Sequence, residues 1–338
     1  MDLLSIVILN YNGRHLLEKF LPSVVRYCEG FRIYVIDNGS VDNSYDLLCK
    51  NFPTVNILSF ARNEGFAGGY NTALRQIESK YYILLNTDVE VTRGWLAPLL
   101  AFMESNRECA ACQPKILSYL KRESFEYAGA AGGFIDLLGY PFCRGRIFNT
   151  LEDDLGQYDD VREIFWTSGA CMIIRSESFH SAGGFDASFF AHMEEIDLCW
   201  RLKRRGWKVY FIFESKVYHL GGGTLMRSNP RKTYLNFRNN LAMLMKNLSW
   251  KTMLWVLPVR LLFDAAAALK FLLSGSPADA TAVWKAWLFL PFRSGKYLRI
   301  AKTMKTDIEF RCMKGFYPKS IILEYFLKGK KQFHRLGA

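Results

Sequence analysis

The chain has 338 residues, of which 50% are hydrophobic and 22% are charged. This length can bury one large core or about two smaller ones, and the composition is too apolar for a disordered chain. The eight cysteines lack the regular spacing of a disulfide framework, which excludes a short disulfide-stapled scaffold and fits a reducing compartment. We therefore expect a folded protein of the cytoplasm.

Charge is distributed unevenly along the chain, whose net charge is +12. Residues 226–338 carry 21 Lys and Arg against 5 Asp and Glu, whereas the part before them carries 23 against 27. In the basic part, Arg260, Asp264 and Lys270 interrupt the apolar stretches, so no stretch provides the roughly 20 uncharged residues that cross a bilayer. These charges share one sector of a helix over residues 259–273, which predicts a helix that lies on a surface.

The first third of the chain alternates short apolar runs with amphipathic stretches. This order predicts βαβ units, which cross over right-handed into a parallel sheet with functional groups at the carboxyl ends of its strands. Asp2 stands where a secretory leader would be basic, so the first run is interpreted as a buried strand. The predicted strands are residues 4–9, 33–36, 55–60 and 81–85.

Polar residues and glycines follow all four predicted strands. Asp37 can accept the imide or amide proton of a base, and Tyr11 offers a flat face, which together fit a nucleotide. A polar residue at a strand end also caps turns, and that alternative stays open for Asp37. The residues are Asn10, Tyr11 and Asn12 after the first strand, Asp37 after the second, Asn63, Gly65, Gly69 and Asn71 after the third, and Asn86, Asp88 and Glu90 after the fourth.

Asp88 and Glu90 stand two positions apart at the end of a predicted buried strand. Carboxylate oxygens suit a divalent cation such as Mn²⁺ or Mg²⁺, which neutralises a diphosphate leaving group. A solvated loop is the alternative, and the neighbouring polar strand ends favour the metal. Gly65 and Gly69 would let a ligand approach the backbone at a helix start. Their spacing differs from the Gly-x-Gly-x-x-Gly of dinucleotide oxidoreductases, which are therefore disfavoured.

Regular structure returns after a long segment in the middle of the chain. Residues 128–162 are rich in glycine and then acidic, which predicts a mobile segment over one face. A strand over residues 170–174, a helix over 195–205 and a strand over 208–213 are expected to follow.

Three acidic residues, Glu194, Glu195 and Asp197, lie at the start of that predicted helix. Burial there would raise a carboxyl pKa, whereas the helix N-terminus would lower it. Acidic residues in a first helical turn commonly cap the helix, and at least one of these is expected to do so. A carboxylate left free of that role is a candidate general base.

Three further motifs, taken together with the strand ends, resemble glycosyltransferase family 2, and in particular its bacterial rhamnosyltransferase-like enzymes of surface polysaccharide biosynthesis. The resemblance extends over about residues 3–245 and leaves out the tail. The motifs are WTSGA at residues 166–170, FFAHMEEIDLCWR at 189–201 and HLGGGT at 219–224.

The resemblance implies a GT-A fold, which is an α/β fold with a mostly parallel, Rossmann-like sheet flanked by helices, extended here by amphipathic C-terminal helices. It also implies an inverting, metal-dependent transfer of one sugar from dTDP-rhamnose or a UDP-hexose to a saccharide acceptor, which we expect to be lipid-linked. Residues 1–245 would form the catalytic domain, with a nucleotide-binding half over 1–127 and an acceptor-side half over 128–245.

The resemblance also assigns roles to residues. Asp37 would bind the base, Asp88 the ribose and the metal, and His219 would complete the metal shell with Glu90. Glu195 would be the general base, and many relatives have Asp at this position. The strict Asp-x-Asp motif likewise has Asp in place of Glu90. The acceptor side is expected to include Trp166, Gly169, Ala170, His192 and Glu194.

Two other functions stay open. One is a protein that binds a nucleotide sugar without catalysis, which intact Asp88, Glu195 and His219 argue against. The other is a nucleic-acid binder through the basic, aromatic tail, which the apolar blocks of the tail and the acidic front of the chain disfavour. We expect this tail, residues 246–338, to dock peripherally on the anionic inner face of the cytoplasmic membrane. The alternatives are that it packs on the catalytic core or on a second subunit, as in a homodimer.

Overall fold

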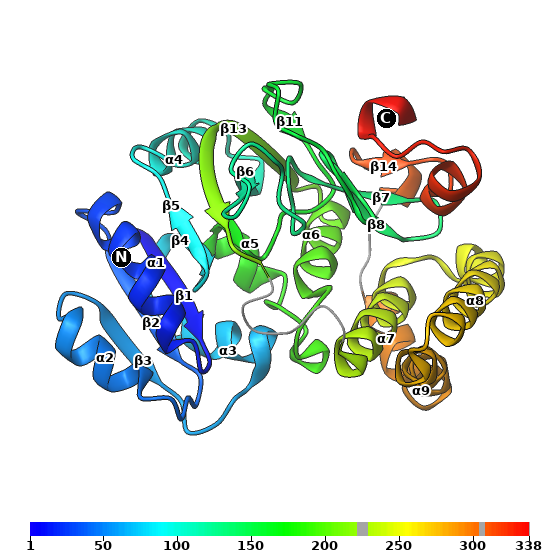
Figure 1. Ribbon diagram of the computed structural model, residues 1–338, viewed down its shortest axis with the longest axis horizontal. Coiled ribbons are helices and arrows are strands. Elements are labelled where there is room, and N and C mark those ends of the chain that lie inside the picture. Colours follow the sequence, from blue (N-terminus) through cyan, green and yellow to red (C-terminus); the bar gives the residue numbers. More distant parts are fainter. Residues whose placement is uncertain (222–228, 304–307, 338) are drawn as a thin grey trace.

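The computed structural model describes residues 1–221, 229–303 and 308–337. Within these residues, a mixed nine-stranded sheet forms the centre, in the order β11-β13-β6-β12-β4-β1-β2-β3, and β5 joins it through β13 (Figure 1). The predicted α/β class is therefore confirmed. The strands are β1 (Asp2–Asn10), β2 (Arg32–Asp37), β3 (Asn56–Ser59), β4 (Ser79–Asn86), β5 (Val89–Val91), β6 (Cys109–Ser118), β11 (Arg162–Glu163), β12 (Cys171–Arg175) and β13 (Lys208–His219).

Helices cover both faces of this sheet. α1, α2 and α4 pack on one face, where Leu17, Leu21 and Val24 of α1 recur at helical spacing and are buried against the strands. α3, α5 and α6 pack on the other face, with Tyr70 and Leu198 in its core. The bounds are α1 (Arg14–Tyr27), α2 (Ser44–Asn51), α3 (Gly65–Leu74), α4 (Leu96–Ser105), α5 (Ser176–Ser181) and α6 (Glu194–Arg204).

The register of the parallel strands brings their polar ends to one edge of the sheet. Asn10 pairs with Asp37 across β1 and β2, and Leu9 pairs with Asn86 across β1 and β4. Because parallel strands all end at the same edge, residues far apart in sequence meet there. This convergence confirms the arrangement predicted from the alternating runs.

Antiparallel strands complete the sheet in a way that the sequence analysis did not predict. β12 runs antiparallel to both β4 and β6. β13 continues to His219, beyond the predicted end at residue 213, and pairs antiparallel with β5 so that His219 lies opposite Val89. His219 is thereby placed beside Asp88, which directly precedes β5. Residues 222–224 of the last motif lie outside the described residues.

Residues 128–162 build a second sheet, where the sequence analysis expected a long mobile segment. This sheet has the order β10-β9-β8-β7-β14, and its strand β14 comes from near the C-terminus. Glycine serves close packing here, because a Cβ on Gly133 would lie 2.2 Å from the ring of Trp166. The strands are β7 (Gly133–Asp136), β8 (Pro141–Cys143), β9 (Arg146–Ile147), β10 (Thr150–Leu151) and β14 (Phe316–Tyr317).

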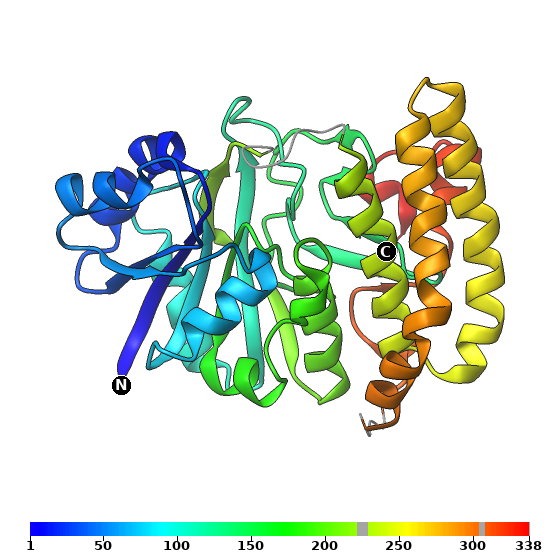
Figure 2. The same cartoon turned by 90° about the horizontal axis from the view of Figure 1, so that it is seen from below.

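The C-terminal part forms three long helices and then returns to the second sheet. Figure 2 shows α7, α8 and α9 side by side at the end of the molecule away from the N-terminal strands. Beyond them, Phe310 stacks on Trp200 of α6 at 4.5 Å. The predicted domain boundary at residue 245 stays a prediction, and residues on both sides of it share one hydrophobic cluster. The helices are α7 (Pro230–Asn247), α8 (Trp250–Leu273) and α9 (Pro277–Thr303), followed by short helical turns at Phe310–Cys312, Leu323–Leu327 and Phe333–Leu336.

Helix α8 contains the predicted surface helix, but two of its charges face inward. Arg260 and Asp264 are each 1% exposed, and Arg260 donates hydrogen bonds to the Leu138 carbonyl and to Asn240. Lys270 is exposed. Over the described residues, no helix combines the length and hydropathy needed to cross a membrane.

Candidate active site

The turns after β1 and β2 hold each other through Ser40. Its hydroxyl oxygen accepts hydrogen bonds from the Asn10 side chain at 3.2 Å and from the Asn12 backbone at 3.0 Å. The Asp37 carboxylate accepts one from the Ser40 backbone at 3.2 Å. Asp37 thus makes the turn contact of the structural alternative and is 7% exposed, while Tyr11 is exposed. Base binding by these two residues stays a prediction.

The start of α3 uses its glycines for packing within the protein. The Asn63 side chain accepts a hydrogen bond from the Gly65 backbone at 2.8 Å. Gly65 has a φ of +75°, and a Cβ there would lie 2.6 Å from the Phe190 carbonyl oxygen. A Cβ on Gly69 would lie 2.8 Å from Leu9. Phe190 and Leu9 therefore pack closely against these two glycines, and contact of the glycines with a ligand stays a prediction.

Asp88 and His219 meet at the edge of the sheet, together with a residue that the sequence analysis missed. His219 Nε2 lies 3.0 Å from the Asp88 carboxylate, and its Nδ1 lies 3.0 Å from Glu126. Burial lowers the pKa of His219, but the two carboxylates outweigh it and raise that pKa to about 10. Glu126 carried no local signal, because it lies 93 positions from His219 in the sequence.

Glu90 does not join Asp88 and His219. Its carboxylate forms an ion pair with Arg122 at 2.8 Å. Over the described residues, no group of three His, Cys, Asp or Glu side chains converges as a metal would require. Asp88 and His219 nevertheless fit a divalent cation in part, because a cation that displaces the Nε2 proton of His219 would meet one nitrogen and one oxygen ligand, both nearly buried and close together. Glu126 contacts the other ring nitrogen of His219, as residues that orient a metal-binding histidine do.

The start of α6 carries the buried Glu194 and the half-buried Glu195. One oxygen each of Glu194 and Glu195, and Nε2 of His192, find no hydrogen-bond partner among the described residues. Burial raises the pKa of Glu195 to about 7, although backbone hydrogen bonds, including one from Gly169, oppose this shift. Burial and the charge of Glu195 raise the pKa of Glu194 well above its usual range. Burial lowers the pKa of His192 to about 4, so this ring is neutral at pH 7.

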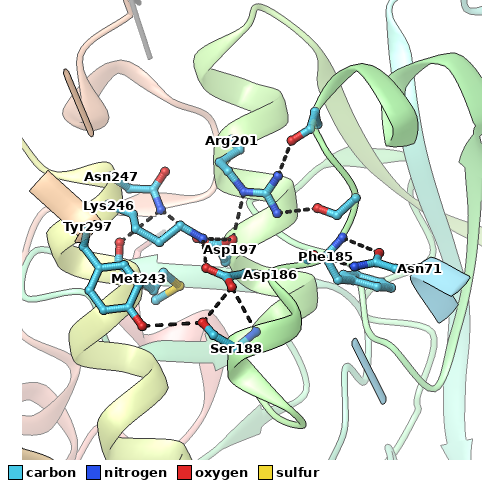
Figure 3. Close-up of polar contacts among 12 residues, drawn as sticks. Asn71, Phe185, Asp186, Ser188, Asp197, Arg201, Met243, Lys246, Asn247 and Tyr297 are labelled. Atoms are coloured by element: carbon cyan, nitrogen blue, oxygen red, sulfur yellow. Dashed lines mark hydrogen bonds and ion pairs between the residues drawn. The ribbon is translucent and has the colours of Figure 1, made fainter. Parts of the chain in front are cut away.

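The third acidic residue of α6, Asp197, is structural. It accepts hydrogen bonds from Lys246 at 2.8 Å, Arg201 at 2.8 Å and Asn247 at 3.1 Å (Figure 3). Burial would raise its pKa, but Lys246 and Arg201 hold that pKa below its usual range. Asp197 therefore ties α6 to α7 and is not a candidate base. Met193 occupies the N-cap position of α6 and its side chain forms no capping hydrogen bond, whereas the Glu195 carboxyl group accepts backbone hydrogen bonds from the first turn of the helix.

The remaining residues predicted for the acceptor side make contacts within the protein, and their contact with an acceptor stays a prediction. The Trp166 indole donates to the Phe134 carbonyl at 2.9 Å, and Ala170 donates through its backbone to Ser168. A Cβ on Gly169 would lie 3.9 Å from the Glu195 carboxyl carbon and 3.2 Å from Phe66 of α3.

Two residues predicted to bind the sugar donor, Asn86 and Asn71, form hydrogen bonds with residues of the predicted acceptor-side half. The backbone of Asn86 donates to the Ala170 carbonyl at 2.9 Å. The Asn71 side chain forms two hydrogen bonds with the Phe185 backbone, at 2.8 and 2.9 Å (Figure 3). Their contact with a donor stays a prediction.

Residues 5–181 of the chain match the family described as glycosyl transferase family 2. The chain is 27% identical over 237 residues to an N-acetylglucosaminyl-diphospho-decaprenol L-rhamnosyltransferase of Mycobacterium tuberculosis, covering 64% of this chain and 76% of the relative. It is 23% identical over 258 residues to the rhamnosyltransferase WbbL of Escherichia coli, covering 69% of this chain and 95% of the relative.

Solved structures resemble the fold. GalNAc-T7 with UDP, GalNAc and Mn²⁺ has a TM-score of 0.54 at 18% identity, covering 73% of this chain and 48% of the other. The mannosyltransferase PcManGT from Pyrobaculum calidifontis, in complex with GDP-Man and Mn²⁺, has a TM-score of 0.51 at 13% identity, covering 89% and 84%. This likeness concerns the GT-A fold and not the substrate.

The two roles assigned to acidic residues of α6 predict opposite effects on stability. Asp197→Asn should lower the free energy of unfolding by about 3 kcal/mol, because it leaves buried Lys246 and Arg201 without their carboxylate. Glu195→Gln should raise it at pH 8 by an amount on the order of 2 kcal/mol, because ionising a carboxyl group whose pKa is raised by folding opposes folding above its unfolded pKa. Urea unfolding measures both values. Equal losses in the two variants would contradict the division of roles.

Proposed function

The chain belongs to glycosyl transferase family 2, and from that premise we propose that it moves one sugar from a nucleoside diphosphate sugar to an acceptor hydroxyl with inversion at the anomeric carbon. The observation that carries the proposal is the environment of the Glu195 carboxyl group. One oxygen of this half-buried carboxyl group is inaccessible and has no hydrogen-bond partner among the described residues, and the pKa of the group is raised to about 7. A base with such a pKa suits proton removal near neutral pH.

The reaction follows from that base in one displacement. Glu195 removes the proton of the acceptor hydroxyl as this oxygen forms a bond to the anomeric carbon. The bond from that carbon to the diphosphate oxygen breaks, and the diphosphate leaves with the electron pair. Because the attack comes from the face opposite the leaving group, the configuration inverts and no covalent sugar intermediate is needed. Burial and the charge of Glu195 raise the pKa of Glu194 as well, which favours the neutral form of Glu194 beside the base.

We propose that Asp88 and His219 hold a divalent cation, Mn²⁺ or Mg²⁺, at the donor diphosphate. When bound, such a cation neutralises the charge that develops on the leaving group. Support comes from the two donor atoms 3.0 Å apart at the ends of β4 and β13. The two structural neighbours were solved with Mn²⁺. Direct ligation by Glu90 would require its carboxylate to leave Arg122.

For the substrates, we propose a dTDP-rhamnose or UDP-hexose donor and a lipid-linked saccharide acceptor. Two relatives are named as rhamnosyltransferases, and one of these names includes a diphospho-decaprenol acceptor. Thermal shifts against a panel of nucleotide sugars, each with and without Mn²⁺, identify the donor, because a ligand at 100 times its Kd adds about 2.7 kcal/mol to stability. Hydrolysis of that donor by the protein separates an enzyme from a protein that only binds the sugar.

We further propose that the enzyme docks on the anionic inner face of the cytoplasmic membrane through an apolar surface of α8. In this helix the exposed leucines share a sector of roughly 120°, and Leu262 and Leu273 are 71% and 81% exposed. Figure 2 shows α8 at the outer side of the bundle. We call this surface the leucine face: Leu254, Leu261, Leu262, Leu269, Leu272 and Leu273.

Charge on α8 and on the neighbouring helix α9 favours an anionic lipid surface as the partner. Their two acidic residues, Asp264 and Asp279, are both buried, whereas Lys251, Lys270 and Lys285 are exposed. An apolar face with lysines beside it suits the boundary between acyl chains and anionic headgroups. A second copy of the chain is the alternative partner for this face.

The general-base role of Glu195 predicts a loss of turnover with intact donor binding. Glu195→Gln should lower kcat by about 10² to 10⁴ and leave the Kd of the donor within twofold. In the wild type, kcat/KM should fall about tenfold per pH unit below pH 7, because only the ionised carboxylate accepts the proton. The variant should lose this dependence. If kcat/KM of Glu195→Gln still fell below pH 7 as it does in the wild type, another group would be the base.

The proposed metal site predicts a loss of metal-dependent donor binding. Asp88→Ala should abolish the additional thermal shift that Mn²⁺ produces with the donor, because it removes the oxygen ligand. Glu18→Ala, an exposed substitution on α1, should leave that shift unchanged. Full activity of the wild type in excess chelator would overturn the metal proposal.

The leucine face predicts binding to vesicles. Leu262→Ser with Leu269→Ser should weaken flotation with vesicles that contain phosphatidylglycerol at least tenfold, because each lost apolar burial is worth about 1.5 kcal/mol or more. Leu120→Ser with Leu155→Ser, at exposed sites elsewhere, should have no effect. If the wild type does not bind vesicles and the first variant turns a dimer into a monomer, the partner is a second copy and the membrane proposal fails.

A further inference from the structure

The loop between α5 and α6 has an unusual backbone. Phe190, His192 and Met193 have φ values of 64°, 72° and 72°, in the left-handed region that residues other than glycine seldom adopt. Such conformations persist only where the surroundings hold them, and they cluster at functional sites. Glu194 and Glu195 directly follow residues 186–193 of this loop, and we call these residues the arch. Whatever holds the arch also sets where α6 begins.

Helix α7 holds the arch from one side. The Asn239 side chain is fully buried, and its amide nitrogen lies 2.9 Å from the carbonyl oxygens of Phe189 and Ala191 and 2.8 Å from that of His192. One amide group thus binds three carbonyls of a single turn. Arg238 donates to the Asn239 amide oxygen at 2.7 Å, which fixes the orientation of that amide.

Helix α3 holds the arch from the other side. The Phe190 carbonyl accepts hydrogen bonds from the backbone of Phe66 at 2.6 Å and of Ala67 at 3.2 Å. These donors belong to the first turn of α3, which would otherwise leave them unpaired. The arch therefore links the helix that follows the third strand end to α7, and it leads into the carboxyl groups of α6.

We propose that Asn239 is a positioning residue, which keeps the arch in its left-handed conformation and thereby aims Glu195 at the acceptor hydroxyl. A buried Asn that only satisfies loop carbonyls would affect stability alone. Because the arch lies between α3 and the proposed base, Asn239 also affects the position of Glu195. Loss of its three hydrogen bonds would let the arch relax toward ordinary backbone angles and turn the start of α6. This inference rests on the proposed role of Glu195.

The test compares two substitutions on the same helix. Asn239→Leu removes the three hydrogen bonds to the arch, and we expect it to lower kcat at least tenfold while the Kd of the donor stays within twofold. Thr233→Val removes one hydrogen bond, from Thr233 to Asp279 of α9, and should leave kcat within twofold. Both are assayed with the nucleotide sugar that the thermal-shift panel identifies, and urea unfolding shows how much stability each has lost.

The pH profile separates positioning from a structural role. A loosened arch admits water to Glu195 and reduces the burial that raises its pKa, so the acid limb of kcat/KM should move to lower pH in Asn239→Leu. A folded Asn239→Leu protein with unchanged kcat and an unchanged limb would overturn the inference. If Asn239→Leu does not fold, Arg238→Met takes its place, because it removes two hydrogen bonds to arch carbonyls. We expect Arg238→Met to lower kcat by at least threefold. An unchanged kcat in this variant would also overturn the inference. Normal turnover in Glu195→Gln would instead show that the base is wrongly assigned.

Discussion

The buried ion pairs of Asp197 fix the helix on which the proposed chemistry depends. One carboxylate receives Lys246 from α7 and Arg201 from the next turn of α6, and Lys246 also binds Asp186 at the start of the arch (Figure 3). Breaking such a pair would leave an unpaired charge in the protein interior, which is costly. These ion pairs hold α6 against α7, and Glu195, about 200° around the helix from Asp197, has no ion-pair partner among the described residues.

The second constraint is the register of the parallel strands. It places Asn10, Asp37 and Asn86 at one edge, and the long strand β13 carries His219 to the same edge beside Asp88. The donor half of the proposed site thus depends on backbone pairing, whereas the acceptor half depends on side-chain contacts between α6, the arch and α7. Asn71 and the first turn of α3 connect the two halves through Phe185 and Phe190.

The sequence carried enough information for the sheet edge and for α6, because both depend on short patterns. Alternating apolar runs predicted β1 to β4, and the acidic cluster marked the start of α6. Long-range contacts left no such pattern: Glu126 reaches His219 across 93 positions and Asn239 reaches the arch across about 50. The glycines of residues 128–162 suggested a mobile segment, but close packing, such as that of Gly133 against Trp166, requires the same residue.

The C-terminal helices show another property that sequence patterns could not predict, which is the direction in which a helix face points. Spacing on a helix shows that charges share a sector, but it does not show whether that sector faces water or protein. In α8 the inward direction is set by Asn240 and by the Tyr140 hydroxyl, which donates to Asp264 at 2.8 Å. The leucines consequently face outward, and the last residues return to pack beside Trp200. The tail is therefore both a part of the central packing and the source of an unpartnered apolar surface.

The most direct test of the account is the anomeric configuration of the first product. Proton NMR during hydrolysis of the identified nucleotide sugar, recorded before the free sugar mutarotates, observes the configuration at the anomeric carbon. A single displacement assisted by Glu195 predicts a first product with the configuration opposite to that of the donor. Retention of configuration would require two displacements or attack from the leaving-group side, and it would contradict the assignment of Glu195 as the base of a one-step reaction.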